Sequence, residues 1–190
     1  MPENAHPEIA PRAFRGLLGV ARRDVTPPVG IYARQWGAAL HDVAEGVHRP
    51  LTMTVLVLRA SAAEAPVALV ALDGGWFRAA EDEWAVRGAA AEALGVDGSR
   101  VLLNLSHTHA ACSLSSVDAD KPGGHLIGPY LEALARAAGK ASREAAESVV
   151  PGTLTAAAIS PSTAICPTPI PKPTALSWPT TPMAPPRIRS

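Results

Sequence analysis

Two histidines spaced two residues apart, His107 and His109, are the residues whose types and spacing most clearly suggest chemistry. They follow Val101–Leu105, a short apolar run typical of a strand, and Gly98-Ser99 before it indicates a turn. If the extended conformation continues to His109, both imidazoles lie on one side of the strand. Neutral imidazole suits zinc, so the pair predicts half a metal site, or one ligand beside an acid–base group. The same spacing also occurs where two histidines only donate hydrogen bonds at a strand end.

Asp73 and His48 are the further candidates for lining such a site. Asp73 ends an apolar run directly before two glycines, where a carboxylate serves either a site or a turn. For His48 and His125, a loop or strand-end position without a metal is the simpler interpretation. Cys112 follows the histidine pair, but a Cys–His hydrolase needs the thiol and the base within hydrogen-bond reach, which spacing alone does not show.

The elements that must position these residues alternate between strands and helices. Apolar, β-branched runs predict strands over residues 17–26, 51–58, 66–73 and 101–105. Helices are predicted over residues 81–94, ended by Gly95, and over residues 129–148, with Pro129 in the first turn. The order predicts an α/β fold: a mixed β-sheet with flanking helices and with both sheet faces covered.

Periodicity assigns an inward face to each helix. The first helix places four residues near one face: Ala80, Trp84, Ala91 and Leu94. The second helix has a clear apolar stripe of four residues: Leu131, Leu134, Ala138 and Ala141. Residues 31–44 lack a clean period and predict a long loop over the fold, the kind of segment that often carries function.

Composition narrows the class of protein. The 190 residues suit one domain, and 17 basic against 17 acidic residues give zero formal net charge, so no nucleic-acid partner is indicated. Two cysteines make no disulfide framework. The N-terminus lacks the features of a secretory signal, and no apolar run is long enough to span a bilayer, so we expect a cytoplasmic location. No specific protein partner is implied.

The chain divides into a loose N-terminus over residues 1–15, a domain over residues 16–157 and a Pro-rich tail over residues 158–190. Nine of the 19 prolines lie after Ser160, whereas no glycine follows Gly152 and no acidic residue follows Glu147. Such a composition predicts disorder. We favour a frameshift as the explanation. Translation in a reading frame displaced by one base permits an amino-acid sequence that contains aspartate and asparagine.

Four separated segments together match one pattern: residues 19–30 (GVARRDVTPPVG), 46–51 (GVHRPL), 70–73 (VALD) and 104–109 (NLSHTH). In order and spacing they resemble the start of the neutral/alkaline, non-lysosomal ceramidase family. The resemblance covers residues 16–155 and implies a zinc amidase that cleaves an N-acyl amide, in a small molecule or a lipid, with a metal-bound water. It implies that His107 is a zinc ligand. It also implies that His109, beside the metal, moves protons or binds the tetrahedral intermediate.

Two departures from the family pattern bear on function. The family usually continues with Ser-Gly-Pro after the histidines, whereas this chain has Ala110-Ala111-Cys112, so a substrate other than ceramide is open. The family's later ligands, a His, a Glu and a Tyr, have no matching positions here. We therefore expect the incomplete N-terminal part of a larger catalytic domain, inactive alone and poorly soluble because apolar surface is uncovered.

Two alternatives remain open at this point. One is a small working metallohydrolase that recruits Asp73 or His125 as a third ligand. The other is a small non-catalytic α/β domain whose Pro-rich tail is an interaction segment.

Overall fold

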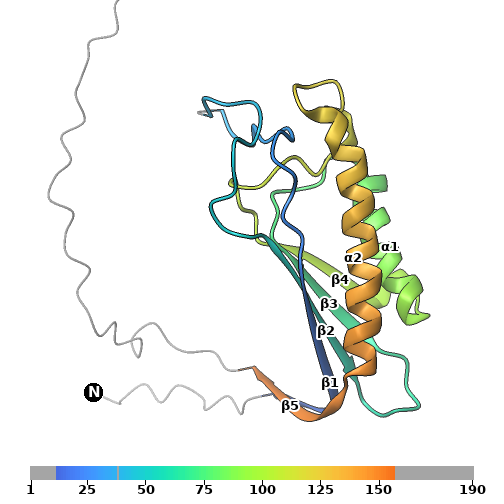
Figure 1. Cartoon of the computed structure of the whole chain (residues 1–190). Coiled ribbons are helices and arrows are strands. Elements are labelled where there is room, and N and C mark those ends of the chain that lie inside the picture. Colours follow the sequence, from blue (N-terminus) through green and yellow to red (C-terminus); the bar gives the residue numbers. More distant parts are fainter. Residues whose placement is uncertain (1–11, 38, 157–190) are drawn as a thin grey trace, which may run out of the picture. The chain divides into compact units, whose positions relative to one another are not determined.

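The computed structural model describes residues 12–37 and 39–156, which form a five-stranded sheet with two helices (Figure 1). The strands are β1 (Arg12–Asp24), β2 (Thr52–Arg59), β3 (Val67–Leu72), β4 (Val101–Leu105) and β5 (Val150–Ala156), and the helices are α1 (Ala80–Leu94) and α2 (Ile127–Glu147). The strand order is β4-β3-β2-β1-β5, in which β3 and β4 are parallel and the other neighbours antiparallel. The predicted α/β class, a mixed sheet with flanking helices, is confirmed.

The core lies between the sheet and α2. Alternate residues of β2 point toward the helices, so that Met53, Val55 and Val57 are each 0% exposed. The stripe predicted for the second helix is buried in full, and its four residues join the same core cluster as these strand residues. Because α2 contacts both β1 and β2, this helix fixes the central strands that lead toward the site.

Helix α1 buries a face that is rotated from the one that periodicity indicated and shares only Ala91 with it. Its buried apolar residues are Val86, Ala90 and Ala91, whereas Trp84 is 51% exposed. The Trp84 ring instead lies under the Arg87 guanidinium, 4.6 Å from ring centroid to Cζ. The helix is rich in alanine on several sides, so its apolar periodicity is weak and contact with α2 decides which face is buried. Its predicted end at Gly95 is confirmed, with φ of 64° and two capping bonds from the Gly95 N–H to the carbonyls of Ala91 and Glu92.

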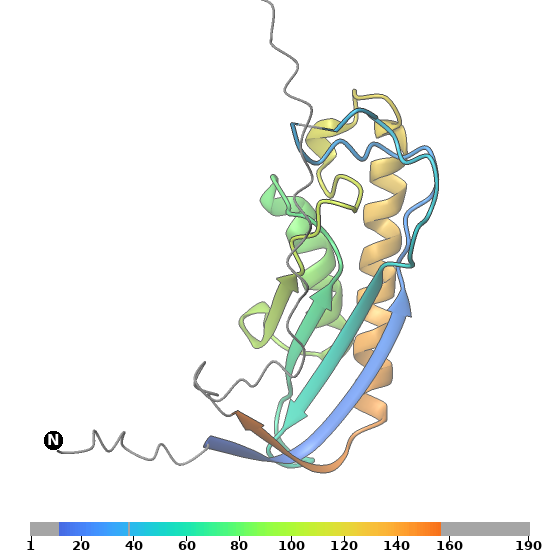
Figure 2. The same ribbon diagram turned by 90° about the vertical axis from the view of Figure 1, so that its left-hand side faces the viewer.

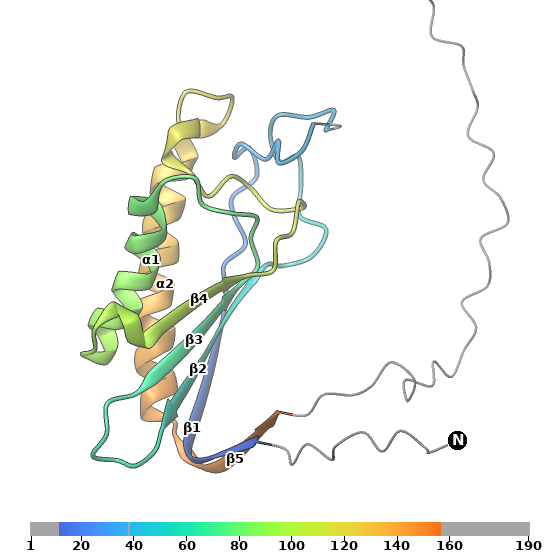
Figure 3. The ribbon, with the colours of Figure 1, turned by 180° about the vertical axis from the view of Figure 1, so that it is seen from behind.

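Both helices cover the same face of the sheet, as Figure 3 shows from behind. On the other face, Val20, Leu102 and Val67 are 59%, 58% and 40% exposed. The expectation that both faces are covered therefore does not hold for the part of the chain that the structure describes. The apolar residues of this outer face nevertheless explain why the strands lack the polar alternation of a half-exposed sheet.

At the edge formed by β1 and β5, the sheet includes more residues than the sequence predicted. β1 begins at Arg12 because its first residues pair with β5, for example Phe14 with Leu154, so residues 12–15 belong to the sheet rather than to a loose terminus. β5 was not predicted, since Pro151 and Gly152 resemble a turn; an edge strand tolerates both. Residues 1–11 and the predicted tail over residues 158–190 lie outside the described residues. None of the described helices has the length and apolar character needed to cross a bilayer.

Candidate functional site

The candidate residues gather at one end of the sheet. The C-terminal ends of β1, β3 and β4 and the N-terminal end of β2 lie together there, because β3 and β4 are parallel and the other pairs antiparallel. The loops at residues 25–37, 39–51 and 106–126 extend beyond this end (Figure 2). Backbone bonds join the loops: the Ser113 N–H donates to the Tyr32 carbonyl at 2.9 Å, and the Tyr32 N–H to the Gly123 carbonyl at 3.4 Å.

The two histidines lie side by side, but not through continued extension of the strand. β4 ends at Leu105, and His107 has φ of 56°, a left-handed backbone conformation that residues other than glycine rarely adopt. The chain then runs beside the segment that follows β3, where the Thr108 N–H donates to the Gly74 carbonyl at 3.1 Å. The imidazole centroids of His107 and His109 are 5.3 Å apart, at an interplanar angle of 77°. The predicted extended conformation to His109 is wrong, yet the turn brings the same two rings together.

One nitrogen of His109 is tied to the long loop that precedes β2. Its Nδ1 lies 3.0 Å from the backbone carbonyl oxygen of Gln35. A carbonyl oxygen only accepts, so Nδ1 carries the proton and the Nε2 of the neutral ring keeps its lone pair. This arrangement suits an imidazole that accepts a proton or binds a metal through Nε2.

Two tryptophans pack around the histidines. The Trp76 ring lies 5.4 Å from the His107 ring and 5.3 Å from the His109 ring, centroid to centroid. Trp36, from the same loop as Gln35, lies 6.0 Å from His109 in an edge-on arrangement. Such contacts limit the rotation of both imidazoles. Gln35 and Trp76 were not among the predicted site residues; the only sequence signal for Trp76 is its place directly after the two glycines that follow Asp73.

Asp73 holds the ends of two strands together. Its Oδ2 accepts from the Thr52 backbone N–H and from the Thr52 hydroxyl, each at 2.9 Å, and its own N–H donates to the Thr52 carbonyl at 2.9 Å. The backbone bond from Thr52 is the main cause that lowers the pKa of this carboxyl, and the Arg22 charge adds to it. Asp73 also lines a cavity of about 340 Å³ that His48, exposed in the loop before β2, lines as well.

A buried polar network anchors the segment that follows the histidines. Asp118, 5% exposed, accepts from the Ser113 hydroxyl at 2.7 Å and forms an ion pair with Arg78. Asp82, in the first turn of α1, accepts from the Ser116 N–H at 2.7 Å and from its hydroxyl at 3.0 Å. These carboxylates fix the chain downstream of His109 to the scaffold, a role that the sequence did not indicate.

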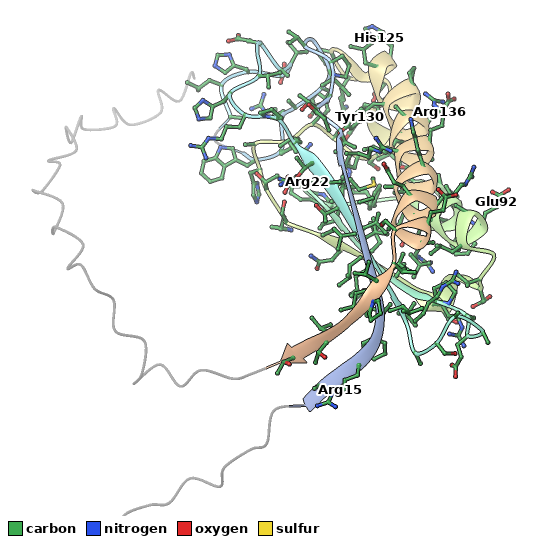
Figure 4. The ribbon with its side chains drawn as sticks, turned by 60° about the horizontal axis from the view of Figure 1, so that its bottom comes forward. Arg15, Arg22, Glu92, His125, Tyr130 and Arg136 are labelled. Carbon is green, nitrogen blue, oxygen red and sulfur yellow. The ribbon has the colours of Figure 1, made fainter. Side chains whose placement is uncertain are left out.

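The histidines do not have a third partner for a metal in the part of the chain that the structure describes. Within residues 12–37 and 39–156, no three His, Cys, Asp or Glu side chains form a group that could hold a metal ion. His125 is exposed in a short turn, η3 (Gly124–Leu126), at the outer end of α2 (Figure 4). A catalytic zinc site uses three protein ligands. The described residues therefore do not complete such a site, and the hypothesis that Asp73 or His125 supplies the third ligand is not supported.

Solved ceramidase structures share this fold. A crystal structure of neutral ceramidase from Pseudomonas aeruginosa matches with a TM-score of 0.58 at 18% identity, over 72% of this chain and 22% of that chain. A ceramidase complexed with C2 matches with a TM-score of 0.54 at 17% identity, with the same coverage. The likeness confirms, at the level of the fold, the resemblance seen in the sequence. This chain spans about a fifth of the length of those proteins. No protein-family model matches the sequence, and no curated protein does.

Proposed function

We propose that this chain is the N-terminal part of a ceramidase-like amidase and contributes His107 and His109 to the site that hydrolyses an N-acyl amide. The observation that carries the proposal is the His109 tautomer. Its Nδ1 is held by the Gln35 carbonyl, and its Nε2 lone pair is left free beside a second imidazole. The ceramidase-like fold and the four sequence segments that resemble the family support the same assignment.

Amide hydrolysis requires proton transfers that an imidazole of this kind performs. The oxygen of water bonds to the acyl carbon, the carbon–nitrogen bond breaks, and the departing nitrogen gains a proton. In the proposal, the His109 Nε2 accepts a proton from the attacking water and returns it to the amine nitrogen. The contacts with Trp76 and Gln35 hold the ring in one orientation for both transfers.

In the proposal, zinc binds at this site with His107 as one ligand. This chain supplies only part of the ligand set. Zinc bound there would supply a polarised amide carbonyl and a more acidic water. The further ligands would come from protein outside the described residues. We therefore propose that the chain by itself binds zinc weakly and does not hydrolyse amides.

Zinc affinity tests the proposal directly. Equilibrium dialysis of the full chain against increasing zinc, with elemental analysis, is expected to give weak binding that His107→Ala abolishes. His125→Ala is the matched control, because His125 is exposed and lies in a separate turn. Binding that survives His107→Ala, or no binding at any zinc concentration, would contradict the proposal. One tightly held zinc together with amide hydrolysis would contradict the incomplete site and favour the small metallohydrolase.

A further inference from the structure

The cavity beside the histidine turn has the size and the lining of a small-molecule site. Its volume of about 340 Å³ lies at the lower end of the usual range for such sites. Most of its wall is apolar, built from small residues and prolines such as Pro27, Ala44 and Ala111. A ligand with one compact apolar group fits this space, whereas a lipid with two long chains exceeds it.

The cavity adjoins the segment that carries His109. Thr108 and Ala110, the residues on either side of His109 in the sequence, both line it. The bond from the Ala110 N–H to the Thr108 Oγ1, at 3.2 Å, closes the turn that forms this part of the wall. A ligand in the cavity therefore lies next to the backbone that presents the proposed proton-transfer group.

Charges in the cavity are unequally compensated. The carboxylate of Asp73 accepts two bonds from Thr52 and lies near Arg22, a β1 residue (Figure 4) that itself donates to the Thr52 hydroxyl at 3.2 Å. Arg49, in contrast, is exposed and forms no ion pair among residues 12–37 and 39–156. Asp73 keeps its negative charge, but the Arg22 charge lies near it, whereas Arg49 has no carboxylate partner among the described residues. A guanidinium binds a carboxylate through two parallel hydrogen bonds.

We propose that this cavity binds a small N-acyl amide that carries a carboxylate, such as an N-acyl amino acid, with the carboxylate on Arg49 and an apolar side chain against the cavity wall. Neither histidine ring lines the cavity, so the proposal assigns the binding of this ligand and not its hydrolysis there. Binding of the carboxylate needs neither zinc nor turnover. In this proposal Arg49 selects the ligand and takes no part in proton transfer.

The proposal is tested by calorimetric titration of the full chain with two matched probes, N-acetyl-leucine and N-acetyl-leucine amide, which differ only in the carboxylate. We expect Kd for the acid to be about tenfold lower than for the amide, as one charge-assisted pair predicts. Arg49→Ala should remove this difference, and Arg49→Lys should restore part of it. Arg143→Ala removes an exposed arginine of α2 and should leave both affinities unchanged. Equal binding of the two probes, or a preference that survives Arg49→Ala, would overturn the proposal.

The outcomes separate this proposal from the proposed function. Binding of the acid that depends on Arg49, in a chain whose zinc binding is independent of His107, supports the cavity assignment and contradicts the proposed amidase site. Zinc binding that depends on His107, without a preference for the acid, supports the amidase site and overturns the cavity assignment.

Discussion

The Nδ1 atom of His109 lies 3.0 Å from the carbonyl oxygen of Gln35, a residue 74 positions earlier in the chain. This contact joins the long loop before β2 to the turn after β4, and it determines which imidazole nitrogen is free. Gln35 itself is 8% exposed, so the carbonyl is presented from a loop segment that packing holds in place. The position of a loop backbone therefore sets the chemistry available to His109.

The His109 tautomer can be observed directly. In a ¹⁵N-labelled sample at a pH where the imidazoles are neutral, long-range proton–nitrogen correlation spectra should show a protonated Nδ1 and an unprotonated Nε2 for His109. Loss of these signals in His109→Gln assigns them, and the exposed His48 is an internal comparison. A His109 ring protonated at Nε2 would show that the Gln35 contact is not formed in solution.

Backbone strain at His107 predicts an unusual order of stabilities. Since φ is 56° at His107, His107→Gly relieves a conformation that His107→Ala retains, and both variants remove the same ring. We expect the glycine variant to be more stable than the alanine variant by about 1 kcal/mol in urea unfolding. The same two substitutions at His48, which lacks a positive φ, should favour neither variant or favour alanine. An alanine variant at 107 that equals or exceeds the glycine variant would argue against the left-handed turn.

Stability should fall at alkaline pH through the buried thiol of Cys112. Burial raises the pKa of Cys112 from 9.0 to about 12, so the unfolded chain loses this proton at lower pH than the folded chain. The contribution of the thiol is complete below about pH 9 and is lost as the pH rises toward 12, by up to about 1.4 kcal/mol per pH unit. Urea unfolding at pH 8 and pH 10.5 should show a smaller loss for Cys112→Ala than for the natural chain. Burial also raises the pKa of Tyr130, so part of the decline should remain in the variant. Identical losses would show that Cys112 is not buried in solution.

The outer face of the sheet predicts self-association. Val20 in β1 and Leu102 in β4 are 59% and 58% exposed on the face that the helices leave uncovered, with β2 and β3 between them. Replacing both with lysine should lower light scattering at a given protein concentration and leave the unfolding midpoint nearly unchanged, because neither side chain contributes to the core. Lysine at Val47, which is 53% exposed in a loop, is the control and should have little effect. Scattering that is insensitive to the sheet substitutions would place the association elsewhere.

Sequence periodicity predicted an element correctly where the element has a continuous apolar pattern of its own. The stripe of α2 is buried as predicted, and the four predicted strands form, because a continuous apolar pattern specifies these elements without reference to distant residues. It failed for α1, where alanine on several sides leaves the phase open, and for β5, whose Pro151 and Gly152 are tolerated only because the strand lies at an edge. In both cases contact with another element decided the outcome.

For the candidate site, the sequence by itself indicated His107, His109 and Asp73 as candidates, together with the strands that bring them to one end of the sheet. Residue type and strand order fix those features, since a parallel pair ends at the same edge. Only the tertiary structure decided that a left-handed turn at His107, rather than an extended strand, brings the rings together. It also brought Gln35 and Trp76 to them and gave Asp73 its bonds to Thr52. These contacts join residues that are far apart in the chain. Such residues come into contact only after hydrophobic packing has positioned the sheet and its loops.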